Sequence, residues 1–156
     1  MCTDEDFHKQ FFSISTESFD KVFGINLKSV FFICQYACKY FIDNKINGNI
    51  LNICSTEGFK DGLVPYGLSK NALISFTRGL GKKMISEGIV INGIAPGATN
   101  TKMMRNNELD YSYDKIPSKR MTSPVEVANL AVFMLSDMGK QMPGQVVTID
   151  GGESLF

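Results

Sequence analysis

Three short apolar segments alternate with three long helical patterns along this chain, and this alternation most restricts its fold. The predicted strands cover residues 49–54, 89–94 and 145–149, and the predicted helices cover 16–43, 65–87 and 124–137. Short apolar strands separated by helices of this length are typical of right-handed β-α-β units, which build a parallel sheet covered by helices. We therefore expect one α/β domain over residues 15–156, preceded by a leader or loop over residues 1–14.

The composition argues against several classes of function. With 156 residues the chain can form one domain with a hydrophobic core. Sixteen Lys and Arg residues balance sixteen Asp and Glu residues, so the charge gives no sign of a nucleic-acid or acidic-membrane partner. The longest apolar run, residues 29–34, is too short to cross a bilayer, and the acidic first residues do not resemble a signal peptide. We expect a cytoplasmic protein without a membrane partner.

The cysteines and the histidine do not form a metal-binding pattern. Cys2, Cys34, Cys38 and Cys54 have no C-x-x-C spacing, and the only histidine is His8. No metal site is expected from such a set. Small buried thiols in a reducing compartment explain these cysteines better than a disulfide framework does.

A tyrosine and a lysine stand four residues apart in the helix that Pro65 is predicted to open. At that spacing the side chains of Tyr66 and Lys70 lie on one helix face. An ammonium close to a phenol favours the phenolate and lowers the pKa of the phenol, and such a phenol can give or take a proton during a reaction. Taken alone, the pair also fits a half-buried ring beside a solvated amine.

Two loops are predicted to lie beside this pair. Ser55 follows the first predicted strand, and residues 96–101 follow the second. Ligands of parallel α/β sheets bind beyond the carboxyl ends of the strands. We therefore expect Ser55, Tyr66, Lys70 and residues 96–101 to converge on one crevice. The polar, weakly patterned residues 102–120 fit a lid or binding loop.

The middle of the first predicted helix, 16–43, is apolar on nearly every side. Such a helix is usually buried on both faces, here against the sheet and against a second body such as another subunit. Asn26 lies inside this helix, and an amide in apolar surroundings needs hydrogen-bond partners. Before further context, a tolerated polar residue and a functional residue explain Asn26 equally well.

A series of short motifs occurs in one order along residues 15–153. The motifs are Asn26-Leu27-Lys28, Asn52-Ile53-Cys54-Ser55, Tyr66-Gly67-Leu68-Ser69-Lys70, Asn92-Gly93-Ile94-Ala95-Pro96-Gly97, Thr101, Pro124-Val125-Glu126-Val127-Ala128, Gly144-Gln145-Val146-Val147 and Asp150-Gly151-Gly152. In this order they resemble the carboxyl-terminal two-thirds of a short-chain dehydrogenase/reductase, and more closely the branch that contains 3-oxoacyl-carrier-protein reductases. The resemblance implies that residues 15–156 form part of a Rossmann-like domain.

The resemblance implies a catalytic group made of Asn26, Ser55, Tyr66 and Lys70. Tyr66 would protonate a ketone oxygen during reduction, or act as the base in the reverse direction. Lys70 would lower the pKa of Tyr66 and hold the nicotinamide ribose. Ser55 would hydrogen-bond the substrate oxygen, and Asn26 would hold a water that links Lys70 to solvent.

The implied cofactor is NAD or NADP, which carries the hydride, and the implied substrate is a small-molecule ketone or secondary alcohol. Tyr66 and Lys70 would contact the cofactor. So would four residues in and after the second predicted strand, namely Ile94, Pro96, Gly97 and Thr101. By the same resemblance, helices 16–43 and 65–87 would join subunits into a homodimer or homotetramer, and residues 102–120 would form the substrate loop.

The chain departs from the family pattern in two places. Only ten residues lie between Ser55 and Tyr66, so the loop beside the substrate is short, and Thr56 is a weaker candidate for the role of Ser55. The glycine-rich dinucleotide fingerprint, G-x-G-x-x-G or T-G-x-x-x-G-x-G, is absent. The expected fold is therefore an incomplete parallel-sheet Rossmann-like fold that lacks the amino-terminal β-α-β half and leaves one sheet edge unpaired.

Three interpretations of function remain open from the sequence. The first is an oxidoreductase sequence that is truncated or derived from a shortened gene model. The second is a non-catalytic remnant or oligomerisation partner that keeps the four catalytic residues but cannot bind the dinucleotide. In the third, another chain supplies the missing half.

Overall fold

The computed structural model describes residues 11–60, 62–101 and 116–155. The expected leader, residues 1–14, and the expected substrate loop, residues 102–120, therefore lie largely outside the described residues. Among the leader residues that are described, Phe11–Ser13 form one short 3₁₀ turn.

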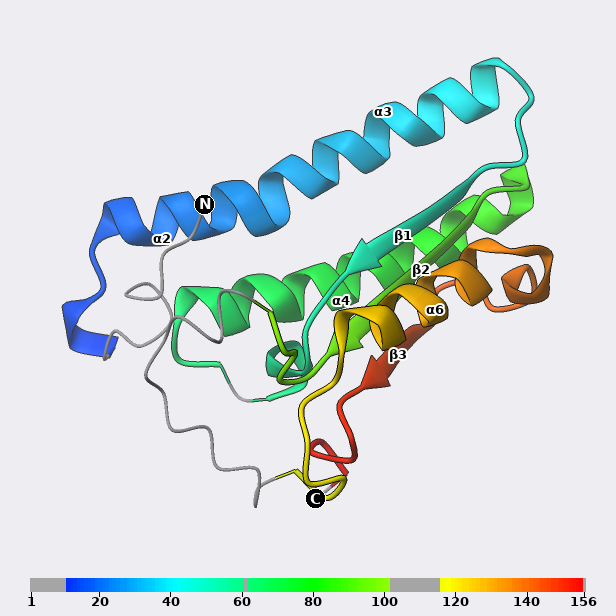
Figure 1. Cartoon of the computed structure of the whole chain (residues 1–156). Helices are drawn as coiled ribbons and strands as arrows, with labels where there is room; N and C mark the ends of the chain where they lie inside the picture. Colours follow the sequence, from blue (N-terminus) through cyan, green and yellow to red (C-terminus); the bar gives the residue numbers. More distant parts are fainter. Residues whose placement is uncertain (1–10, 61, 102–115, 156) are drawn as a thin grey trace.

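The sheet consists of three parallel strands in the order β1-β2-β3 (Figure 1). Strand β1 covers Asn49–Ile53, β2 covers Val90–Pro96 and β3 covers Val146–Ile149. Ile94 of β2 is in register with Ile53 of β1 and with Val147 of β3. The parallel α/β architecture expected from the alternating pattern is confirmed.

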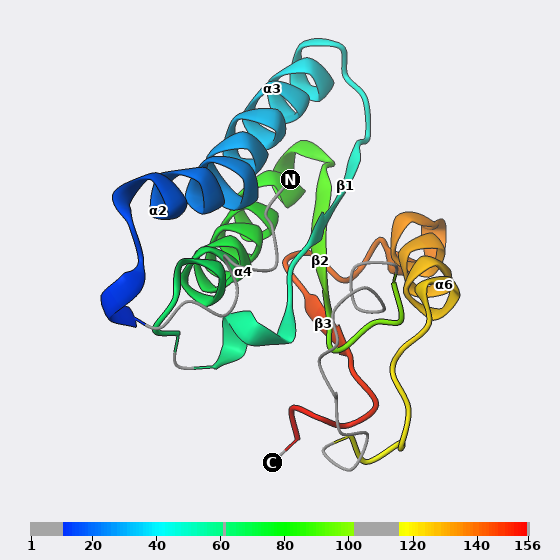
Figure 2. The ribbon, with the colours of Figure 1, turned by 60° about the vertical axis from the view of Figure 1, so that its left-hand side comes forward.

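Helices cover both faces of the sheet. Helix α2 spans Thr16–Phe23 and continues through a π-helical turn, Gly24–Lys28, into α3, Ser29–Asp43. Helix α4 spans Pro65–Met84, and α6 spans Pro124–Leu135. Figure 2 shows α2, α3 and α4 on one side of the sheet and α6 on the other. The central strand β2 is consequently buried from Val90 to Ala95.

Within this chain helix α3 is buried on one face, and the cover that a second body such as another subunit would give to the other face stays a prediction. Cys34 and Cys38 are buried, and Cys38 packs with Ile89 and Ile91. The opposite face is exposed, with Tyr36 at 72% accessibility and Ile33 at 66%. The reason is that α4 and the sheet lie under the first face, while none of the described elements lies over the second (Figure 2).

Several element ends differ from the sequence prediction by one to three residues, and the ends of β2 and α4 show why. Strand β2 runs on through Ala95 and Pro96 because Pro96 stays in register with Ile149 of β3. Helix α4 ends at Met84 and is followed by a 3₁₀ turn, Ile85–Glu87. Gly88 then stops the helical region, as predicted, with a left-handed φ of 73°.

Three of the cysteines are described, and Cys34, Cys38 and Cys54 are free and buried. Burial raises the pKa of each of these thiols, which disfavours the reactive thiolate.

Among the described residues, no helix is long and apolar enough to cross a membrane. In the same part of the chain, no group of three or more His, Cys, Asp or Glu side chains could hold a metal ion.

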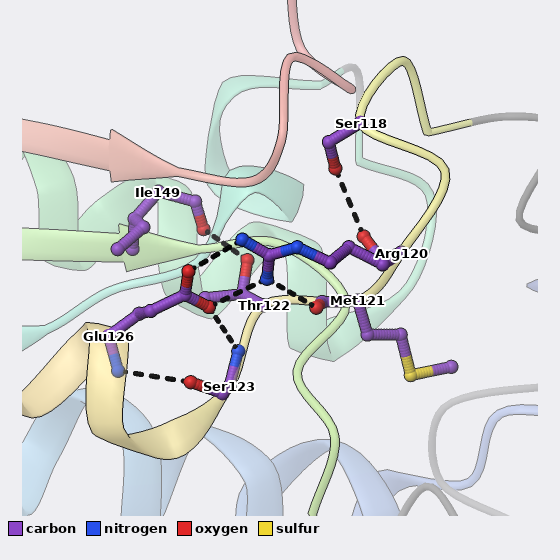
Figure 3. A network of polar contacts seen from close by, with 7 residues as sticks. All are labelled: Ser118, Arg120, Met121, Thr122, Ser123, Glu126 and Ile149. Carbon is purple, nitrogen blue, oxygen red and sulfur yellow. Dashed lines mark hydrogen bonds and ion pairs between the residues drawn. The ribbon is translucent and has the colours of Figure 1, made fainter.

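Side-chain caps begin α2 and α6 where the sequence predicts them. Ser15 accepts a hydrogen bond from the Ser18 N–H at 3.2 Å at the start of α2. At α6, Ser123 and Glu126 form a reciprocal capping box. Arg120 makes a two-pronged contact with the Glu126 carboxylate, at 2.7 and 2.8 Å (Figure 3). Arg120 is thereby tied to the first turn of α6.

Glu126 makes stability depend on pH in the acid range. The hydrogen bond from Arg120, followed by that from the Ser123 N–H, lowers the pKa of the Glu126 carboxyl from 4.5 to about 2. A carboxyl with a lowered folded-state pKa stabilises the fold above its unfolded-state pKa, and this contribution is lost as the pH falls towards 2.

We expect Glu126→Gln to have a lower Tm than the wild type at pH 7 and a smaller drop in Tm between pH 4.5 and pH 2. Gln retains an oxygen for the Ser123 N–H but loses the charge that pairs with Arg120. Thermal unfolding across this pH range measures the effect, and Glu87→Gln in the exposed 3₁₀ turn is the control. Equal acid sensitivity in the Glu126→Gln variant and the wild type would contradict the assignment.

Candidate active site

Ser55 follows the last residues of β1 and is buried, with 7% of its surface accessible. Its side chain accepts a hydrogen bond from the Glu57 N–H at 3.2 Å and so caps a 3₁₀ turn, Thr56–Phe59. The next residue, Thr56, donates from Oγ1 to the carbonyl of Pro96 at 3.4 Å. The carboxyl ends of β1 and β2 are thus joined at the level of Ser55.

Tyr66 and Lys70 lie on the first turns of α4, which begins at Pro65. The Lys70 Nζ lies 5.8 Å from the centre of the Tyr66 ring. The same ammonium donates to the carbonyl of Ile53 at 2.8 Å. Because Ile53 ends β1 two residues before Ser55, this bond brings Lys70 to the strand end that carries Ser55.

The turn that carries Ser55 packs directly against α4 at Gly58. A Cβ atom at Gly58 would lie 2.7 Å from the Lys70 carbonyl carbon and 2.6 Å from the Ile74 Cδ1 atom. The Asn71 Nδ2 atom also donates to the Gly58 carbonyl at 2.9 Å. The absence of a side chain at Gly58 therefore lets the turn approach the helix backbone beside Lys70.

Asn26 reaches the same helix from the π-helical turn. There the Ser29 N–H donates to the carbonyl of Gly24, five residues back, instead of four as in an α-helix. The Asn26 Nδ2 atom donates to Ser69 Oγ at 3.1 Å, and Ser69 Oγ donates to the Tyr66 carbonyl at 2.7 Å. The amide therefore has a hydrogen-bond partner, Ser69, which lies on α4 between Tyr66 and Lys70 in the sequence.

Residues 96–101 form the turn that follows β2. The Gly97 N–H donates to the Ile149 carbonyl at 3.1 Å, and a Cβ atom at Gly97 would lie 2.6 Å from the Asp150 Cβ. Beyond it, Thr99 pairs with Thr122 in an isolated parallel bridge, and the Thr101 N–H donates to the Thr99 carbonyl at 2.8 Å. The turn is thereby held against the carboxyl end of β3.

Ile94 lies in β2 beside the end of β1, in register with Ile53. Its side chain has no accessible surface, because β2 is the central strand and is covered by α4 and α6. Its contact with the cofactor stays a prediction. Pro96, Gly97 and Thr101, in contrast, are each partly accessible.

Two polar residues support the site without having been assigned a role from the sequence. Ser69 links Asn26 to Tyr66, as described above. Asp150 is 8% accessible and accepts hydrogen bonds from the N–H groups of Gly152 and Ser154, at 2.9 and 2.8 Å. Burial alone would raise the pKa of the Asp150 carboxyl, but these hydrogen bonds outweigh it and hold the pKa below its usual value. The Asp150-Gly151-Gly152 motif was the sequence signal for this turn.

Two open cavities lie on the helical face of the molecule. One of about 890 Å³ is lined by residues of α2, the π turn, α3 and α4, including Leu27, Phe31 and Phe76. The other, of about 420 Å³, lies between α3 and α4 and includes Cys38 and Leu80. Neither cavity is lined by Asn26, Ser55, Tyr66 or Lys70.

The sequence is similar to a known family model and to several known proteins. Residues 2–154 match the family model described as enoyl-(acyl carrier protein) reductase. The chain is 33% identical over 149 residues to 3-oxoacyl-[acyl-carrier-protein] reductase FabG of Aquifex aeolicus, covering 92% of this chain and 60% of that protein. It is 36% identical over 145 residues to 2-dehydro-3-deoxy-D-gluconate 5-dehydrogenase of Dickeya dadantii, covering 88% of this chain and 57% of that protein.

A solved structure shares the arrangement of elements. The structure of ElxO with NADP bound superposes with a TM-score of 0.84 at 26% identity, over 93% of this chain and 61% of that chain. The chain thus spans about 60% of the length of the curated relatives that it matches.

Proposed function

The chain belongs to the short-chain dehydrogenase/reductase family, and from this premise we propose that it is an NAD(P)-dependent oxidoreductase. The reaction would interconvert a ketone and a secondary alcohol, with Tyr66 as the general acid and base. One observation carries the proposal: the Lys70 ammonium lies 5.8 Å from the Tyr66 ring and also bonds the strand end that bears Ser55. A phenol, an ammonium and a hydroxyl at one strand end form the set that carbonyl reduction requires.

Each side chain has a chemical task in this proposal. The Tyr66 hydroxyl gives its proton to the carbonyl oxygen in reduction and takes it back in oxidation. The Ser55 hydroxyl donates a hydrogen bond to the same oxygen, where negative charge develops. The Lys70 ammonium stabilises the phenolate that remains after proton transfer. Asn26 is tied to the residue before Lys70 through its hydrogen bond to Ser69.

The donor set suits the nicotinamide half of the cofactor. A bound nicotinamide supplies or accepts the hydride. The Lys70 ammonium and the Tyr66 hydroxyl offer donors for ribose hydroxyls. Pro96, Gly97 and Thr101 lie at and after the end of β2, which Thr56 joins to the strand end that bears Ser55. The glycine-rich fingerprint for the pyrophosphate is not among the 156 residues, so these residues account for the nicotinamide and ribose only.

A second candidate is a non-catalytic protein that associates through its helices. It is favoured by the cavity of about 890 Å³ on the face of α2, α3 and α4 and by the exposed rings of Phe31 and Phe32 beside it. Apolar surface of this kind is typical of subunit contacts. The expected assembly would be a homodimer or homotetramer through the predicted helices 16–43 and 65–87.

One sample separates the two candidates. We expect the purified 156-residue chain to bind NADH or NADPH with saturable nicotinamide fluorescence, and Lys70→Met to weaken that binding by about tenfold, since it loses a charge-assisted hydrogen bond. The matched control is Lys82→Met, which removes an ammonium from the last turn of the same helix. Light scattering on the same sample gives the oligomeric state. A folded oligomer that binds neither dinucleotide would support the second candidate and contradict the first.

A further inference from the structure

Ser69 occupies a buried position between two elements of the candidate site. It has no accessible surface and lies on α4, one residue before Lys70. Its Oγ atom lies 3.1 Å from Asn26 Nδ2 and 2.7 Å from the Tyr66 carbonyl oxygen. Asn26 and Ser69 are 43 positions apart in the sequence, so this hydroxyl joins the π turn to the start of α4.

The chemistry of the partners fixes the direction of both hydrogen bonds. A backbone carbonyl can only accept, so the single hydroxyl proton of Ser69 must point at Tyr66. The hydroxyl then has only lone pairs left for Asn26, and the amide must present its Nδ2 donor. Rotating the Asn26 amide would place two acceptors against each other. Ser69 thus dictates the orientation of the Asn26 amide.

We propose that Ser69 is a positioning residue that locks the Asn26 amide and the π turn to the backbone of Tyr66. The hydroxyl itself touches no reacting group in this proposal. It sets where Asn26 lies relative to Tyr66 and Lys70, and it restrains the first turn of α4, on which the Tyr66 phenol and the Lys70 ammonium stand. The activity part of this inference rests on the proposed function, whereas the positioning part does not.

Helix α4 offers a matched control in Thr77. This residue also has no accessible surface, and its Oγ1 atom accepts from the Nδ2 atom of a buried asparagine, Asn52, at 2.9 Å. It lies eight positions after Ser69, which is about 12 Å along the helix axis. Ser69→Ala and Thr77→Val therefore each remove a buried hydroxyl that accepts a hydrogen bond from an asparagine amide. Ser69 lies beside Tyr66 in this helix, whereas Thr77 lies about two turns further along it.

The first measurement follows the ionisation of the Tyr66 phenol by NMR with ring-labelled tyrosine, assigned by comparison with Tyr66→Phe. The cation beside this phenol is Lys70. We expect Ser69→Ala to move the ionisation to higher pH, because the first turn of α4 is less restrained and the Tyr66 ring then lies for less of the time beside the Lys70 ammonium, which the Ile53 carbonyl holds. Asn26→Ala, which removes the same hydrogen bond from its other end, should move it in the same direction, and the double variant should move it little further. Thr77→Val should leave it unchanged.

The second measurement is the rate of ketone reduction with NADH. We expect Ser69→Ala to lower kcat about tenfold with KM changed less than about twofold, since the substrate-binding groups stay in place. Thr77→Val should lose a similar amount of Tm but keep its kcat.

The outcomes are separable. An unchanged Tyr66 ionisation in both Ser69→Ala and Asn26→Ala overturns the inference. If Ser69→Ala does not fold, Asn26→Ala at its half-buried site decides the same question. A wild-type chain that reduces no ketone overturns the proposed function, while the ionisation measurement still decides whether Ser69 positions Tyr66.

Discussion

Replacing Tyr66 by Phe is expected to abolish ketone reduction while leaving the binding of NADH nearly unchanged. The substitution removes only the hydroxyl that gives the proton to the developing alkoxide. A positioned general acid contributes about 10²–10⁴-fold to the rate, so kcat should fall by at least this factor. The ring itself stays, and so does its packing beside Lys70. Stopped-flow or steady-state oxidation of NADH with a ketone substrate measures the loss, and nicotinamide fluorescence measures the retained binding.

Tyr36→Phe is the matched control for this experiment. Tyr36 lies on α3 and is 72% exposed, so removing its hydroxyl should change neither the rate nor the binding of NADH. A Tyr66→Phe variant with wild-type kcat would remove the phenol from the mechanism. Ser55 would then be the remaining hydroxyl at the strand end, and the proposed division of roles would be wrong.

The sequence was most informative where structure depends on neighbouring residues. Ser15, Pro65 and the Ser123–Glu126 pair mark helix starts because a cap is a contact between residues within a few positions. The parallel sheet could be predicted for a similar reason, since alternating strands and long helices leave few other arrangements. Ser55 follows a strand and Tyr66 and Lys70 lie on the first turns of a helix, as the sequence predicts, while their joint role in a site stays a prediction.

Features that depend on distant contacts could not be predicted. The π turn at Gly24–Lys28 has no local signal, and its Asn26 finds its partner 43 positions away. The exposed face of α3 was unpredictable because apolar residues around a helix do not say what covers them. Ile94 and Pro96 show the same limit within one strand. Their burial and pairing are set by α6 and β3, both of which come later in the chain.

The candidate site is therefore held by contacts that carry no chemistry of their own. Lys70 is tied to β1 through Ile53, and Asn26 is tied to α4 through Ser69. The turn bearing Ser55 is tied to α4 through Gly58 and Asn71. Proton-transfer groups lose efficiency when their geometry is loosened by as little as an ångström. The strongest test of the site is thus a change to its scaffold that leaves every catalytic side chain in place.

Gly58→Ala is expected to lower both stability and activity without altering any proposed catalytic group. The new Cβ atom would lie 2.7 Å from the Lys70 carbonyl carbon and 2.8 Å from its oxygen, and backbone atoms cannot rotate away as a side chain can. The turn Thr56–Phe59 must therefore move off α4 and take Ser55 with it. Forced overpacking costs about 1–3 kcal/mol, which corresponds to a fall in Tm of about 3–10 °C for a chain of this size. Thermal unfolding and kcat measure the two effects.

Gly79→Ala on the exposed side of α4 is the matched control. A Cβ atom at Gly79 meets nothing within 4 Å, so this variant should gain about 0.5–1 kcal/mol of stability from the better helix propensity of alanine. Its activity should equal that of the wild type. If Gly58→Ala kept the wild-type Tm and kcat, the turn would accommodate the added methyl group. Its close approach to α4 would then not be what holds Ser55 near Lys70. If it lost Tm but kept kcat, the approach would stabilise the fold without positioning Ser55 for the reaction.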